Sequence, residues 1–280
     1  MWSADVDPLL HSGDGSAVLT PDFDSGALPE RTERAVLQLA DGSDLLLFGE
    51  IHGIREVPRV VAGLLPKLTA LGYRGLALEL PAPERDPLAG WARGDTPQPP
   101  SCFPHPAWDG RANVQVLGLV RASVAAGWQV LCIDQGPDQP MVRWADRDHW
   151  MARNLWTQWQ QLCPTGKIVG ICGNLHARVR PDSSPGSAPV RVLGWLQRLR
   201  RTRDELGPSL AGWVQQEYPE VAVHSIMVTF QTGSAFFNGR VQRLGPFRVG
   251  RVGSGFDPRY SLVLRLPQAT AATFLAHPRG

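Results

Sequence analysis

Residues 45–53 read Leu-Leu-Leu-Phe-Gly-Glu-Ile-His-Gly, and residues 168–177 read Ile-Val-Gly-Ile-Cys-Gly-Asn-Leu-His-Ala. Both are apolar runs that lead into Gly-x-x-His. An apolar run followed by Gly is typical of a buried strand that stops at the edge of a sheet. In open parallel sheets, the residues that follow such strands lie at the ligand-binding edge. We therefore expect a site that contains His52 and His176.

Strand-like and helix-like segments alternate along most of the chain. Apolar periodicity predicts strands over 44–48, 75–80, 128–134, 167–172, 221–230 and 260–266, and helices over 30–40, 57–71, 113–126, 141–162 and 192–206. The strand–helix–strand unit over 44–80 predicts parallel pairing with a right-handed crossover. The fold class is therefore α/β, with a mostly parallel central sheet flanked by helices.

The length of 280 residues fits one large domain. Residues 1–30 are polar and predict an irregular N-terminal arm, and 31–280 predict a single α/β domain. Residues 82–111 are rich in Pro, Gly and aromatics, which predicts a long loop insertion and a candidate lid. The strands that follow a connection at 181–189 predict a strand-rich C-terminal extension.

Composition excludes several functional classes. Apolar residues make up 43% and charged residues 19%, as in ordinary globular proteins, and the formal net charge is only +2. Nothing in this balance calls for nucleic acid or a membrane surface. The start has no signal-peptide pattern, and no run approaches the ~18 apolar residues of a membrane helix. We expect a reduced, cytoplasmic protein that acts on a small molecule; its oligomeric state stays open.

Four predicted strand ends carry titratable side chains: Glu50 with His52, Glu79, Asp134 and His176. Glu50 and His52 are two residues apart, so their side chains share one direction in an extended chain. Glu79 lies within an apolar strand, and burying an unpaired carboxylate costs several kcal/mol. A histidine, an arginine or a metal would compensate that cost. These groups therefore predict a shared site.

Other polar residues lie close to these strand ends in the sequence. Arg55 is expected to pair with Glu50 or Glu79, or to hold a substrate carboxylate or phosphate. Arg147 and Asn154 share one face of a predicted helix. The expected substrate-binding residues are Asp134, Arg147, Asn154 and Asn174.

Two kinds of chemistry stay open. Without a metal, one histidine is a general base that activates water, while the other histidine or Arg55 stabilises an oxyanion. With a metal, His52, Glu79 and His176 are its ligands. The sequence has neither a Gly-x-Ser-x-Gly elbow nor a Gly-rich phosphate cradle after a strand.

Four short motifs carry a family resemblance: Gly49-Glu-Ile-His52-Gly53, Leu76-Ala-Leu-Glu79, Arg147-Asp-x-x-Met-Ala152-x-Asn154 and Gly173-Asn-Leu-His176-Ala177. In their order and spacing they resemble the superfamily that joins erythromycin esterases, ChaN-type haem-uptake proteins and Tiki-type metalloproteases. A weaker similarity covers Phe256-Asp-Pro-Arg-Tyr260. The resemblance implies a helix-flanked sheet with His52, Glu79 and His176 in its cleft.

The branches of this superfamily imply different activities. Esterase-like members use a histidine to activate water without a required metal, Tiki-like members are metal-dependent peptidases, and ChaN-like members bind haem. The esterases are longer, with helical insertions that shape a macrolide cleft, so a macrolide substrate is not expected here.

We expect a hydrolase that cleaves an ester, lactone or amide in a small or medium-sized natural product, for instance in a biosynthetic pathway. His52 would be the general base, Glu79 its orienting partner and His176 a second acid/base, with Glu50 and Arg55 in support. No cofactor is expected to be required. The alternatives are a divalent-metal peptidase, a haem-binding protein, a cyclase that uses the same acid/base pair, and a binding domain without catalysis.

Overall fold

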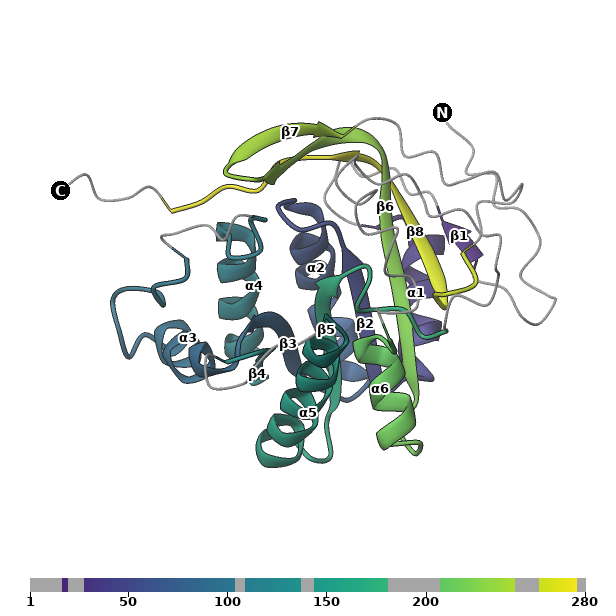
Figure 1. Ribbon diagram of the computed structural model, residues 1–280, viewed down its shortest axis with the longest axis horizontal. Coiled ribbons are helices and arrows are strands. Elements are labelled where there is room, and N and C mark those ends of the chain that lie inside the picture. Colours follow the sequence, from purple (N-terminus) through teal and green to yellow (C-terminus); the bar gives the residue numbers. More distant parts are fainter. Residues whose placement is uncertain are drawn as a thin grey trace.

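The computed structural model describes residues 17–19, 28–103, 109–136, 144–180, 207–244 and 257–275. A central sheet is covered by helices on both faces (Figure 1). The strands are β1 (Ala17–Leu19), β2 (Leu45–Glu50), β3 (Tyr73–Pro81), β4 (Gln129–Asp134), β5 (Lys167–Gly173), β6 (Val223–Phe237), β7 (Arg240–Leu244) and β8 (Leu262–Ala269). The helices are α1 (Glu30–Asp41), α2 (Glu56–Ala70), the 3₁₀ turn η1 (Ala82–Glu84), α3 (Arg85–Arg93), α4 (Val114–Ala125), α5 (Trp144–Leu162) and α6 (Leu210–Glu217).

The sheet has the strand order β1-β8-β6-β2-β5-β3-β4, and all neighbours along this path are parallel. Strand β7 pairs antiparallel with the distal half of β6. The α/β class and the mostly parallel sheet are thus confirmed. The late strands β6 and β8 belong to this same sheet.

One pairing differs from the prediction. Strands β2 and β3 are parallel but not neighbours, because β5 lies between them and pairs with both. Helix α5 returns the chain from β4 at the sheet edge to this central position. The residues of β5 from Ile168 to Cys172 are buried, as expected for a strand covered on both faces. The carboxyl ends of β2, β5 and β3 consequently lie side by side.

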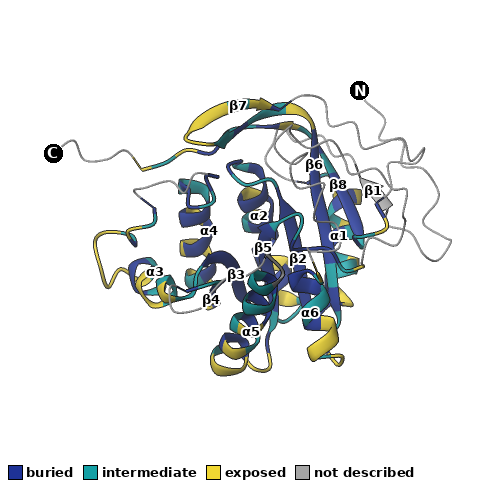
Figure 2. Ribbon diagram, viewed as in Figure 1, coloured by how far each residue is buried: buried dark blue, intermediate teal, exposed yellow. Residues whose placement is uncertain are grey.

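The alternation of side chains in β2 separates two apolar layers. Leu46 and Phe48 pack in the layer of α1, α2, α3 and α4, whereas Leu45 and Leu47 pack in the layer of α5 and α6. Figure 2 shows the sheet as the buried centre between the two layers. A sheet held in this way on both faces is a rigid support for the residues that follow its strands.

The prediction of a loop over 82–111 is wrong for its first part, which forms η1 and α3. Leu88 and Trp91 are buried and lie three residues apart, on one face of the helix. Pro83 and Pro87 suggest a loop in the sequence. A proline in the first turn of a helix nevertheless removes no intrahelical hydrogen bond, so both are compatible with η1 and α3. Gly94, at φ 89°, ends α3. A lid role for this region stays a prediction.

The remaining predicted boundaries of helices and strands agree with the structure to different degrees. Strand β6 continues seven residues beyond its predicted end at Phe230, and α6 was not predicted. Much of the expected N-terminal arm, the connection over 181–189 and the helix over 192–206 lie outside the described residues. Within the described ranges, the structure contains no helix that is both long and apolar enough to cross a membrane.

Candidate functional site

The sheet brings the predicted histidines together around one carboxylate. His52 lies in the turn after β2, Glu79 near the end of β3, and His176 in the turn after β5. The Nε2 atom of His52 is 3.2 Å from Glu79 Oε2, and the Nε2 atom of His176 is 3.5 Å from Glu79 Oε1. Glu79 therefore lies between the two imidazole rings.

Glu79 is also held by three further donors. Arg111 Nη1 and Arg147 Nη2 donate to its Oε1 atom at 2.8 and 2.6 Å, and the Gly173 N–H donates to Oε2 at 2.7 Å. Burial alone would raise the pKa of Glu79, but the charges of Arg111 and His52 hold that pKa well below its usual range. Glu79 therefore stays ionised.

His52 has a carboxylate at each nitrogen. Its Nδ1 atom is 3.0 Å from Glu50 Oε1, opposite the Nε2 contact with Glu79. Burial would lower the pKa of His52, but the charge of Glu79 and the hydrogen bond that His52 donates to Glu50 outweigh burial and Arg111, and raise it to about 10. The imidazole is therefore protonated at neutral pH. Burial also raises the pKa of Glu50, although His52 opposes this shift.

His176 has a different environment. Its Nδ1 atom makes a short contact with the carboxylate of Asp148, a residue on α5 that is 1% exposed. Its Nε2 atom is 3.2 Å from Arg147 Nη1. Because a guanidinium donates and never accepts, this contact makes Nε2 an acceptor and places the imidazole hydrogen on Nδ1, toward Asp148. Asp148 and His176 thus form a carboxylate–imidazole pair with a defined tautomer.

Asp134 and Asp109 hold the two guanidinium groups in place. Asp134 accepts from Arg147 Nε at 2.9 Å and Nη2 at 2.7 Å, and from Arg111 Nη1 at 3.1 Å. Asp109 Oδ2 accepts from Arg111 Nη2 at 2.5 Å. The predicted Asp134 is therefore a member of the cluster through its arginines.

Sequence reasoning missed Asp109, Arg111 and Asp148. Asp148 follows the predicted Arg147 directly, and its position on the helix that carries Arg147 was the available signal. Asp109 and Arg111 lie in non-periodic chain between α3 and α4, which gives no signal of where their side chains go.

Arg55 does not make the predicted pairing. Its Nε atom is 3.8 Å from Glu56 Oε1, its side chain is 40% exposed, and no ion pair in the described chain joins it to Glu50 or Glu79. The Ile54–Ala271 bridge and the hydrogen bond from the Arg55 N–H to Thr270 O turn this segment toward the chain after β8.

The two predicted asparagines support the framework of the site. The Asn154 side-chain amide donates to the carbonyls of Ile133 and Asp134 at 3.2 Å each, which ties α5 to the end of β4. The Asn174 N–H donates to Glu50 O at 2.9 Å, and its carbonyl accepts from the Tyr260 hydroxyl at 2.8 Å. Both residues therefore fix the strand ends that carry the cluster.

The donors around Glu79 bear on the metal and haem alternatives. Both Glu79 oxygens already accept hydrogen bonds, and the Nε2 atom of His176 faces a guanidinium. A metal ion held by His52, Glu79 and His176 would have to displace these donors and lie beside two cationic arginines. A haem iron bound to the Nε2 atom of His52 or His176 would lie beside the same charged groups. In the described part of the chain, no three His, Cys, Asp or Glu residues are placed to hold a metal. The arrangement does not fit either group.

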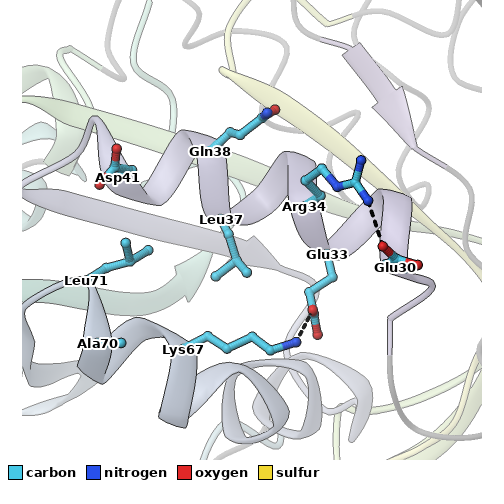
Figure 3. A pocket seen from close by; sticks show the side chains of 9 residues that line it. All are labelled: Glu30, Glu33, Arg34, Leu37, Gln38, Asp41, Lys67, Ala70 and Leu71. Atoms are coloured by element: carbon cyan, nitrogen blue, oxygen red, sulfur yellow. Dashed lines mark hydrogen bonds and ion pairs between the residues drawn. The ribbon is translucent and has the colours of Figure 1, made fainter.

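A groove of about 600 Å³ lies between α1 and α2, away from this cluster (Figure 3). Its lining residues are Glu30, Glu33, Arg34, Leu37, Gln38, Asp41, Lys67, Ala70 and Leu71. Lys67 reaches across it to Glu33, and Arg34 pairs with Glu30 along α1. None of the catalytic candidates lines the groove, so substitutions of its side chains are expected to leave the cluster unchanged.

Gly173 makes room for both histidines. A Cβ atom there would lie 3.1 Å from His52 Nε2 and 3.4 Å from His176 Cδ2. Since carboxylates hold both rings, Gly173→Ala is expected to displace them and lower kcat of the activity proposed below about tenfold or more, because misplacement by tenths of an ångström matters at a reacting centre. Gly63→Ala, where a Cβ meets nothing within 4 Å, should leave kcat unchanged. Steady-state kinetics test this, and equal kcat values for both variants would contradict it.

No family model matches the chain, and no curated protein matches it. Solved structures do resemble it. A Bacillus cereus protein aligns with a TM-score of 0.59 at 10% identity, over 87% of this chain and 93% of that one. A mutant of the erythromycin esterase EreC in its open conformation gives 0.55 at 11% identity, over 84% and 80%. A succinoglycan biosynthesis protein gives 0.55 at 10% identity, over 89% and 88%. At these identities the likeness concerns the fold, and this chain has an erythromycin-esterase-like fold.

Proposed function

We propose that the protein is a hydrolase that cleaves an ester, lactone or amide of a small or medium-sized molecule by acid–base catalysis, without a resident metal. The observation that carries the proposal is the position of ionised Glu79 between the Nε2 atoms of His52 and His176. A carboxylate in this position stabilises a proton on either ring, so one ring can act as the acid and the other as the base in the same reaction cycle.

The two environments assign the roles. His52 is protonated at neutral pH and is therefore the acid. His176, with Nδ1–H directed at Asp148, presents an Nε2 lone pair and is therefore the base once Arg147 releases that atom to a water. This assignment exchanges the general-base role expected for His52 with that of His176.

Hydrolysis by these groups consumes one water molecule. His176 Nε2 takes a proton from water while the water oxygen bonds to the carbonyl carbon of the substrate. The carbon–oxygen or carbon–nitrogen bond to the leaving group breaks, and His52 gives that group its proton. The acid and the alcohol or amine leave, and the proton on His176 returns to His52 through solvent.

The two arginines suit the intermediate of this reaction. Arg111 and Arg147 have side chains that are 16% and 11% exposed, more than the 2% of Glu79 beneath them. Guanidinium donors that are held in place before the substrate arrives stabilise a developing oxyanion. The name of one structural neighbour, an erythromycin esterase, supports the same reaction class.

A substrate panel tests the proposal. Purified protein is assayed with p-nitrophenyl acetate, δ-valerolactone and p-nitroacetanilide, each with and without EDTA, and products are identified by mass. We expect hydrolysis of at least one substrate, unchanged by EDTA. His149→Gln is the matched control, because His149 pairs with Glu217 outside the cluster and should retain full turnover.

Two results would contradict the proposal. One is a lack of turnover of all three bond classes by folded protein. The other is activity that EDTA abolishes and added Zn²⁺ restores. A product of cyclisation or elimination would keep the acid–base pair and replace hydrolysis as the reaction.

A further inference from the structure

The C-terminal part of the chain is fixed directly against the turn that holds His52. Gly53 has φ 76°, and its carbonyl accepts the N–H groups of Phe236 and Ala272 at 2.9 and 2.8 Å. A Cβ atom on Gly53 would lie 2.0 Å from Phe236 O, so only glycine lets the end of β6 approach so closely. In the view of Figure 1 the β6–β7 hairpin lies above α2 and α4, and the end of β6 contacts the turn that carries His52.

An aromatic pair lies at this border. The rings of Phe236 and Phe274 have centroids 4.4 Å apart and are tilted by 56°. Phe236 Cδ1 would lie 3.0 Å from a Cβ on Gly110, the residue between Asp109 and Arg111. The Phe236 ring therefore contacts the segment that supplies Arg111, while its backbone contacts the turn that supplies His52.

Exposed apolar side chains continue this pair outward. Among the described residues, the large hydrophobic side chains that are exposed are Val241, at 62%, and Leu275, at 36%. Val241 is the cross-strand partner of Phe236 in the hairpin, so the two side chains share one face. Leu275 follows Phe274 directly. We call Phe236, Val241 and Phe274 the hairpin patch; apolar side chains that gather at a partly exposed surface mark binding sites.

We propose that the hairpin patch binds an apolar acyl chain of the substrate whose carbonyl lies at the histidine cluster. This inference rests on the proposed hydrolase activity and adds the substrate class to it. The cluster itself offers charged, hydrogen-bonded groups that suit a polar reacting bond. The patch supplies apolar surface next to that bond, and its contacts with Gly53 and Gly110 fix its position relative to His52 and Arg111.

Chain-length dependence tests the patch. The wild type is expected to hydrolyse p-nitrophenyl octanoate with kcat/KM at least tenfold above that for p-nitrophenyl acetate, since each added methylene in an apolar subsite favours binding. Phe274→Ala should lower kcat/KM for the octanoate about tenfold, mainly through KM, and leave the acetate within twofold. Leu37→Ala, in the groove between α1 and α2, is the control and should change neither ester.

Octanoate binding gives a second readout that needs no turnover. By isothermal titration calorimetry, octanoate should bind the wild type about tenfold more tightly than it binds Phe274→Ala. Should Phe274→Ala fail to fold, Val241→Asp carries the same expectations, because that side chain is 62% exposed. The proposed role of the patch would be overturned by equal losses of kcat/KM for both esters, or by octanoate binding that neither variant weakens. Octanoate binding that depends on the patch, without cleavage of any ester, would instead contradict the hydrolase proposal alone.

Discussion

His52→Gln and His176→Gln are each expected to lower kcat for an alkyl ester by about 10²- to 10⁴-fold, the usual contribution of a positioned acid or base. The two losses should depend differently on the leaving group. An alkoxide needs the proton that His52 supplies, whereas p-nitrophenolate leaves without it. The loss of kcat caused by His52→Gln should therefore be at least tenfold smaller for a p-nitrophenyl ester than for a methyl ester. The loss of kcat caused by His176→Gln should be the same for both esters.

Asp148→Asn extends the same test. Asp148 contacts Nδ1 of His176 and not the substrate, so it is a positioning residue. An asparagine amide that donates to Nδ1 would favour the other tautomer and remove the lone pair at Nε2, and kcat should fall about 10²-fold with KM nearly unchanged. His149→Gln again serves as the control. If the loss of kcat is instead smaller for the p-nitrophenyl ester in His176→Gln and unchanged in His52→Gln, then His176 is the acid and His52 is the base.

The histidines and Glu79 were predictable because each is tied to a strand that the sequence marks clearly. Leu45–Phe48 and Ile168–Cys172 are apolar, and a glycine ends each run, so the position of the following histidine at a sheet edge is a local property. Glu79 was recognisable since a carboxylate within an apolar strand demands a partner.

The charged partners of Glu79 could not be predicted in the same way. The insertion of β5 between β2 and β3 is a long-range choice of strand order, and it places Gly173 N–H and His176 beside Glu79. Arg111 reaches the site from the segment after α3, whose sequence has no periodic pattern. The Phe236 contact depends on the continuation of β6 beyond its predicted end, which the Gly53 turn makes possible. Such contacts follow from tertiary packing and leave no periodic pattern.

Glu79→Gln is expected to remove the charge that keeps His52 protonated. With Glu79 neutral, burial and Arg111 still lower the pKa of His52 while the hydrogen bond that His52 donates to Glu50 raises it, so the pKa should fall from about 10 toward the ordinary value. Gln retains a carbonyl for the Gly173 N–H, and both arginines retain Asp134. ¹⁵N NMR of the imidazole measures the pKa directly, without any substrate.

The same substitution changes how stability depends on pH. In the wild type the pKa of His52 is higher in the folded chain, about 10, than in the unfolded chain, about 6.5. The stabilisation from this group is therefore full below pH 6.5 and is lost as the pH rises toward 10. Urea unfolding at a series of pH values should show this decline in the wild type and a flatter profile in Glu79→Gln. Glu217→Gln, which removes the partner of His149, should keep the wild-type profile. A His52 that titrates near pH 6.5 in the wild type would refute the assignment of His52 as the acid, because that ring would be largely neutral at physiological pH.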